Sequence, residues 1–244
     1  MFDFGAFCYL DVQKTGSSFV LDLLTRHSAR PLERSVRHGR VRWPAPEGGD
    51  PRLYFITCRD PVAQWRSLYF YGCDGQGALF HFLRRTQPDT AALYDGSAAG
   101  LNAWLARLLD PGFAPAMPEQ YDRTCPALYG FQTARFLLLS FRRPVMRLRS
   151  LTTRADLIAA YEAERLHAHV LRTESLNDDL AALIRGPLAP HIRDIDAACA
   201  DLAGGRRLNA SSHAGAGADI RIDPALHDLI RRREWFFYDV LGYA

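Results

Sequence analysis

The sequence predicts a three-layer α/β fold, in which helices cover both faces of a central parallel sheet. Short apolar runs typical of strands alternate with longer segments whose apolar residues recur at helical spacing. The first two runs are each followed by a polar turn and a helix, as expected for parallel strands joined by crossover helices. With 244 residues and 48% hydrophobic content, the chain is long enough to bury one sizeable core. We therefore expect a single domain spanning residues 1–244.

The first strand is predicted at Ala6–Val12, a nearly continuous apolar run that suits a strand covered on both faces. A polar turn follows, and the helical pattern begins at Ser18 and reaches His27, with Ser17 or Ser18 as the N-cap. The first N–H groups of a helix lack intrahelical acceptors, and the helix dipole is positive there. A strand, a polar turn and a helix in this order therefore favour an anion-binding site.

The second strand is predicted at Leu53–Cys58. Asp60 suits the N-cap and Pro61 the first position of the helix that follows, which extends to about Gly72. The third strand is expected at Ala168–Arg172 and is followed by a helix to about Arg185. Further helices are expected at 79–85, 101–109, 128–141, 157–166, 192–202 and 224–240, and loops at 43–51, 110–126 and 204–219. The segment from about 72 to 128 has the composition of an insertion over the substrate face.

Composition limits the function classes. A formal charge of +3, without a recognition motif or a continuous basic helix, argues against a nucleic-acid partner. Five widely spaced cysteines without a Cys-x-x-Cys pair argue against a disulfide framework and a structural zinc site. No apolar run approaches the length of a membrane span, and the N-terminus lacks the basic flank of a signal peptide, so we expect a cytoplasmic protein.

Two candidate anion sites follow the first two predicted strands. Lys14 is the only lysine among the 30 lysine and arginine residues, and it precedes a Thr-Gly-Ser-Ser turn. Lysine presents a compact charge, which suits a loop whose N–H groups crowd the same phosphate or sulfate oxygens. Arg59 ends the second strand, and Ser67 lies about two helical turns further on. Two such sites suggest a ligand with two anionic ends.

These motifs, Gln-Lys-Thr-Gly-Ser-Ser-Phe and then Arg-Asp-Pro-x5-Ser, resemble those of the sulfotransferases that use 3′-phosphoadenosine 5′-phosphosulfate (PAPS). The resemblance is closest to the branch that includes the heparan sulfate O-sulfotransferases and bacterial relatives. The Asn-x-Ser segment near Asn209 and the aromatic C-terminus are also similar to that family, so the resemblance covers most of the chain.

The resemblance implies a P-loop-like loop that holds the 5′-phosphosulfate and a second motif that holds the 3′-phosphate. The implied residues are Lys14, Thr15, Gly16, Ser17 and Ser18 at the 5′ end, Arg59 and Ser67 at the 3′ end, and Asn209 and Ser211 near the cofactor phosphate. It implies sulfuryl transfer from PAPS to a hydroxyl or amine, without a metal. A saccharide acceptor is suggested by the branch, and small molecules, lipids and peptides remain open.

Lys14 is expected to stabilise the bridging oxygen of the breaking bond, by analogy with phosphoryl transfer. For the catalytic base the family suggests His38, and a solvated histidine in an arginine-rich loop is the alternative. His27 is a weaker candidate, because a cation in the last turn of a helix has a structural reason to be there. Two departures bear on the site: Gln64 replaces a second arginine of the Arg-Asp-Pro motif, and Asp11 stands where some relatives carry histidine.

Rival interpretations are a kinase or ATPase, a metal site, and an inert module. A P-loop kinase needs glycines where this chain has Cys8 and Gln13. His167 and His169 have metal-ligand spacing but lack a third clustered ligand. A non-catalytic nucleotide- or glycan-binding module of the same fold remains the main alternative, because the base is not fixed by the sequence.

Overall fold

The computed structural model describes residues 1–42, 49–204 and 220–244. The chain divides into two compact units. The first comprises Met1–Arg59, Leu138–Pro144 and Ala160–Asn209, and the second comprises Asp60–Leu137, Val145–Ala159 and Ala210–Ala244. Within the described ranges, no helix is both long enough and apolar enough to cross a membrane.

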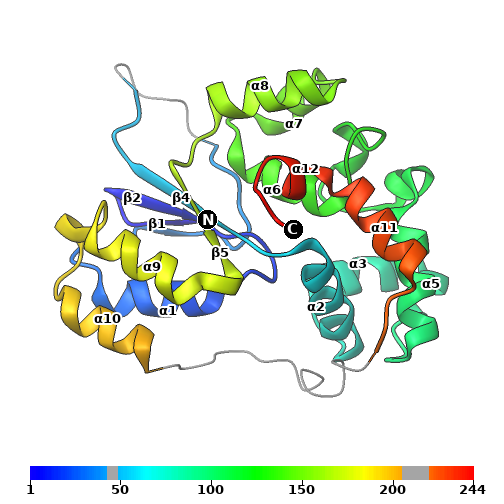
Figure 1. Ribbon diagram of the computed structural model, residues 1–244, viewed down its shortest axis with the longest axis horizontal. Coiled ribbons are helices and arrows are strands. Elements are labelled where there is room, and N and C mark those ends of the chain that lie inside the picture. The colour runs from blue at the N-terminus through cyan, green and yellow to red at the C-terminus, as the bar shows by residue number, and fades with distance from the viewer. Residues whose placement is uncertain (43–48, 205–219) are drawn as a thin grey trace. The chain divides into compact units, whose positions relative to one another are not determined.

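The first unit contains a five-stranded sheet in the order β3-β1-β2-β4-β5 (Figure 1). The strands are β1 (Phe2–Asp3), β2 (Phe7–Leu10), β3 (Arg34–Ser35), β4 (Leu53–Cys58) and β5 (His169–Arg172). The three strands expected from the sequence are β2, β4 and β5, and they are parallel to one another. In their register Tyr9 lies opposite Phe55, and Phe55 lies opposite His169.

The sheet is mixed rather than purely parallel, which corrects one part of the prediction. β1 pairs antiparallel with both β2 and β3. β1 and β3 have only two residues each. A periodic sequence pattern needs at least four residues to be recognised, so neither strand could be predicted. The α/β class itself is confirmed.

Both sets of side chains that alternate along the central strands are buried. On one face Phe7, Tyr9 and Phe55 belong to a core cluster with residues of α1 (Ser17–His27), α9 (Leu176–Arg185) and α10 (Ile195–Ala203). On the other face the side chains are at most 3% exposed; they are Cys8, Leu10, Tyr54, Ile56 and Cys58. Burial on both sides explains why these strands read as continuous apolar runs.

The remaining elements are mostly helical. They are α2 (Pro61–Cys73), α3 (Ala78–Thr86), α4 (Pro88–Ala91), α5 (Ala98–Leu109), α6 (Phe131–Ser140), α7 (Pro144–Arg149), α8 (Arg154–Glu164), α11 (Pro224–Arg233) and α12 (Trp235–Asp239), with 3₁₀ helices at Pro111–Ala116, Tyr121–Arg123, Thr173–Ser175 and Ala189–His191. α2 begins as predicted, because the Asp60 carboxylate accepts a 2.7 Å hydrogen bond from the backbone N–H of Ala63 and Pro61 holds the first helical position.

The C-terminal helix expected over 224–240 is interrupted at Glu234, which separates α11 from α12. The buried Glu234 carboxylate accepts hydrogen bonds from the backbone N–H groups of Gln132 (3.1 Å) and Thr133 (2.8 Å), in the first turn of α6. Burial raises the pKa of Glu234, and these hydrogen bonds act against that rise. The interruption therefore coincides with a tertiary contact that local sequence does not reveal.

Candidate functional site

The predicted anion-binding turn connects the carboxyl end of β2 to α1. Because β2, β4 and β5 are parallel, their carboxyl ends lie along the same edge of the sheet, where open α/β sheets bind ligands. Gly16 is the N-cap of α1 with φ 85°, and Lys14 has φ 64°. The prediction of a serine N-cap is thus wrong: Ser17 already begins the helix, because the left-handed cap conformation favours glycine.

Gly16 also lies close to a neighbouring helix. A Cβ at this position would lie 2.8 Å from Cδ2 of Leu176, the first residue of α9. The turn is therefore packed closely against the helix that follows β5.

Thr15 is held by a chain of hydroxyl groups inside the first unit. Its Oγ1 donates to the carbonyl of Val12 (2.7 Å) and lies 2.6 Å from Oγ1 of Thr57, which lies 2.9 Å from the hydroxyl of Tyr9. A hydroxyl has one hydrogen to donate, so Thr57 donates to Thr15 and Tyr9 donates to Thr57. The Thr15 side chain thus fixes the turn, and its hydroxyl hydrogen is already used there. A hydrogen bond from Thr15 to an anion would come from the backbone N–H.

Positive charge gathers around the first turn of α1. That turn contains no acidic residue and no side-chain cap. Arg59 follows β4, and its Nη1 donates to the carbonyl of Lys14 (3.3 Å). Arg37 donates from Nη1 to Oγ of Ser18 (3.3 Å). The helix dipole adds further positive potential at the same place, so the arrangement attracts an anion.

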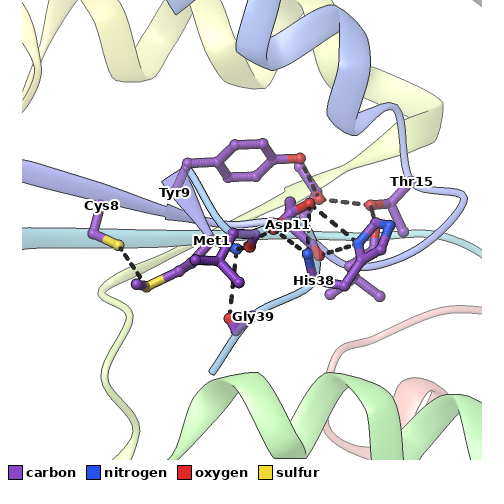
Figure 2. Close-up of polar contacts among 10 residues, drawn as sticks. Met1, Cys8, Tyr9, Asp11, Thr15, His38 and Gly39 are labelled. Atoms are coloured by element: carbon purple, nitrogen blue, oxygen red, sulfur yellow. Dashed lines mark hydrogen bonds and ion pairs between the residues drawn. The ribbon is translucent and has the colours of Figure 1, made fainter. Parts of the chain in front are cut away.

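His38 is held in a turn after β3 with φ 54°. Its backbone N–H donates to both oxygens of the Asp11 carboxylate (3.0 and 3.1 Å). Its ring Nδ1 lies 2.9 Å from the Asp11 carbonyl and 3.1 Å from Asp11 Oδ2 (Figure 2). The structure therefore brings His38 to Asp11, three residues before Lys14, with 29% of the histidine side chain exposed.

Asp11, the departure noted in the sequence, is the partner that holds His38. It follows the last residue of β2 and is fully buried. Its carboxylate also contacts the amino group of Met1, which in turn contacts the carbonyl of Val36. Figure 2 shows Met1 and His38 meeting at Asp11.

The described structure does not test three of the other predicted site residues, and it gives a fourth, His27, a different partner. Ser67 is half-buried on α2 in the second unit, and its role at the 3′-phosphate stays a prediction. Asn209 and Ser211 lie outside the described residues. His27 is occupied elsewhere, since its Nε2 lies 2.7 Å from Asp201 Oδ2.

The His-x-His pair is divided between two environments. His167 is buried, and its Nε2 lies 3.2 Å from Oγ of Ser140, whereas His169 is half-buried at the start of β5. Burial, together with the positive charge of Arg165, lowers the pKa of His167 to about 3. Among the described residues, no group of three or more His, Cys, Asp or Glu side chains is placed to hold a metal ion.

Sequence reasoning missed three contributors to this site: Arg37, Thr57 and Asp11 as the partner of His38. Arg37 adjoins His38 in the sequence, so its proximity to the turn could have been expected once His38 was placed there. Asp11 and Thr57 act through contacts between distant segments, for which local spacing contains no signal. Comparisons with protein-family models, with curated proteins and with solved structures find no match.

Proposed function

We propose that the protein is a sulfotransferase that moves a sulfuryl group from PAPS to a hydroxyl or amine of an acceptor. The observation that carries the proposal is the concentration of donors and positive charge at the turn between β2 and α1. Arg59 donates to the carbonyl of Lys14 in this turn, and Arg37 donates to Ser18 in the first turn of α1, which has no side-chain cap. His38 contacts Asp11, three residues before Lys14. The motif resemblance supplies the reaction class, and this local chemistry supports it.

PAPS, when bound, supplies the sulfuryl group and two anionic ends. The backbone N–H groups of Thr15 to Ser18 and the ammonium of Lys14 would hold the 5′ end, and Lys14 would stabilise charge on the leaving phosphate. Arg59 and Ser67, and by resemblance Asn209 and Ser211, would hold the 3′ end. His38 would accept the proton of the acceptor through Nε2. No metal is needed for these roles.

The acceptor is proposed to be a saccharide or another small hydroxyl compound, selected by the segment 72–128. We also propose that helices cover both faces of the sheet, which gives three layers. A cytoplasmic location also belongs to the proposal.

Calorimetric binding of adenosine 3′,5′-bisphosphate, AMP and ATP without metal tests the proposal. A two-ended anion site predicts strong preference for the bisphosphate. Equal binding of the three nucleotides, or ATP binding that requires Mg²⁺, would overturn the sulfotransferase assignment in favour of an inert module or a kinase.

Arg59→Ala tests the placement of the 3′ end. We expect the bisphosphate to lose about 1.5–3 kcal/mol of binding free energy, roughly a 10- to 150-fold loss, because a hydrogen bond to a charged group disappears. AMP, which lacks the 3′-phosphate, should bind as before. Arg232→Ala, at an exposed position on α11, is the matched control and should change neither affinity. Parallel losses for AMP and the bisphosphate would show that Arg59 does not contact the 3′ end.

A further inference from the structure

The contacts of Asp11 carry an inference about which nitrogen of His38 accepts a proton. A backbone carbonyl oxygen can only accept a hydrogen bond. The 2.9 Å contact between His38 Nδ1 and the Asp11 carbonyl is therefore a hydrogen bond only when Nδ1 carries the hydrogen. The ionised Asp11 carboxylate, 3.1 Å from the same nitrogen, imposes the same requirement.

We infer that Asp11 is the positioning residue of His38: it fixes the neutral ring as the Nδ1–H tautomer and leaves Nε2 as the proton acceptor. Among the described residues, Nε2 of His38 has no hydrogen-bond partner, while both Asp11 contacts are on the Nδ1 side. The division of roles is that of a general base whose second nitrogen is held by an orienting group.

Asp11 also fixes the backbone of His38. A left-handed conformation costs a non-glycine residue about 1–2 kcal/mol. The φ of 54° at His38 is accompanied by two hydrogen bonds from its own N–H to the Asp11 carboxylate. Asp11 thus acts on His38 through two groups: its carboxylate holds the backbone N–H and the ring, and its carbonyl holds the ring. The charged and titratable groups near it are the amino group of Met1, His38 and the phenol of Tyr9.

The tautomer can be measured without an assay. Nitrogen-15 chemical shifts of the ring, taken where His38 is neutral, distinguish a protonated from an unprotonated nitrogen. We expect Nδ1 to be protonated and Nε2 unprotonated in the unmodified chain. The reverse assignment, which free histidine prefers in water, would overturn the inference. His227, exposed on α11, provides an internal control in the same spectrum.

Kinetics then test the positioning role, which rests on the proposed function. His38→Ala should lower kcat by about 10²–10⁴-fold, the range for loss of a general base. Asp11→Asn, which keeps the shape and one acceptor oxygen, should give a smaller loss in kcat with the KM for PAPS unchanged. Because the variant keeps the backbone carbonyl of residue 11, wild-type kcat in Asp11→Asn would contradict a positioning role of the carboxylate.

The two possible failures are distinguishable. Bisphosphate binding checks that Asp11→Asn remains folded, and Asp11→Glu is the conservative variant expected to restore part of kcat. An Nδ1–H tautomer in a chain that shows no sulfuryl transfer would retain the positioning role and reject the proposed function. An Nε2–H tautomer in an active chain would do the opposite.

Discussion

At the scale of single residues, the site combines strain and charge. Lys14 and His38 are two of five non-glycine residues with positive φ in the described part of the chain. Such conformations persist only where the surrounding structure imposes them, and they cluster at functional sites. Hydrogen bonds to Asp11 hold His38 in its conformation. Lys14 lies in the turn that is closed by the hydrogen bond from Thr15 Oγ1 to the Val12 carbonyl. The surrounding structure therefore fixes the backbone of both residues proposed for catalysis.

Lys14→Ala is expected to lower kcat by about 10²–10³-fold, the range for removal of one donor to a developing anion. Binding of adenosine 3′,5′-bisphosphate should fall far less, because the best contact of the ammonium forms in the transition state. Alanine has a Cβ, as lysine does, so both disfavour the left-handed backbone conformation to a similar degree. The comparison therefore isolates the effect of the ammonium group. Lys14→Arg, which keeps the charge but not its compact shape, is the matched variant. Equal losses in turnover and in bisphosphate binding would remove the catalytic role.

The composition offers an independent measurement at this residue. Because Lys14 is the only lysine, an amine-selective reagent modifies one side chain and the terminal amine. Peptide mass spectrometry should show that the bisphosphate slows modification of Lys14 specifically.

At the scale of elements, the junction of β2 and α1 depends on glycine. Gly16→Ala should destabilise the first unit by more than about 1 kcal/mol, since it combines a positive φ with a close approach to Leu176. Gly75 is a matched control, because its φ of 71° is similar but no atom lies within 4 Å of the position of a Cβ. Chemical denaturation should show a larger loss for Gly16→Ala than for Gly75→Ala, and only the former should weaken bisphosphate binding. Identical losses would show that Leu176 moves aside at no cost.

The helices, strands and site contacts show what the sequence can and cannot predict. The strands β2, β4 and β5 were predictable because burial on both faces leaves a continuous apolar run, and α2 because Asp60 and Pro61 mark its start locally. The two-residue strands were not predictable, nor was the break at Glu234, because each depends on a partner far away in the chain. At the site, sequence motifs predicted the turn. The Asp11–His38 and Thr15–Thr57 contacts could not be predicted, because each joins residues that are far apart in the chain.

At the scale of the whole molecule, stability and pH are linked through buried ionisable groups. His167 lies next to β5, and its Nε2 is near the hydroxyls of Ser140 and Tyr161, so it connects two of the three segments that form the first unit. Its pKa of about 3 in the folded chain lies below the ordinary histidine value of 6.5. As pH falls below 6.5, the unfolded chain therefore binds a proton that the folded chain does not bind.

The contribution of His167 to stability is thus fully present above pH 6.5 and is lost as pH falls towards 3, by at most about 1.4 kcal/mol per pH unit. His167→Gln should flatten this dependence, because glutamine does not titrate and still offers polar atoms to Ser140. Hydrogen exchange of the β5 amides, corrected for intrinsic rates, measures opening of the first unit at pH 7.5 and 5.5. His227→Gln, at an exposed position, should leave the wild-type slope intact. If His167→Gln also kept that slope, the acid sensitivity would have to come from carboxylates. Asp50 would be the first to examine: although burial acts to raise its pKa, hydrogen bonds from Tyr54 and Arg142 outweigh that effect and hold the pKa well below its usual value.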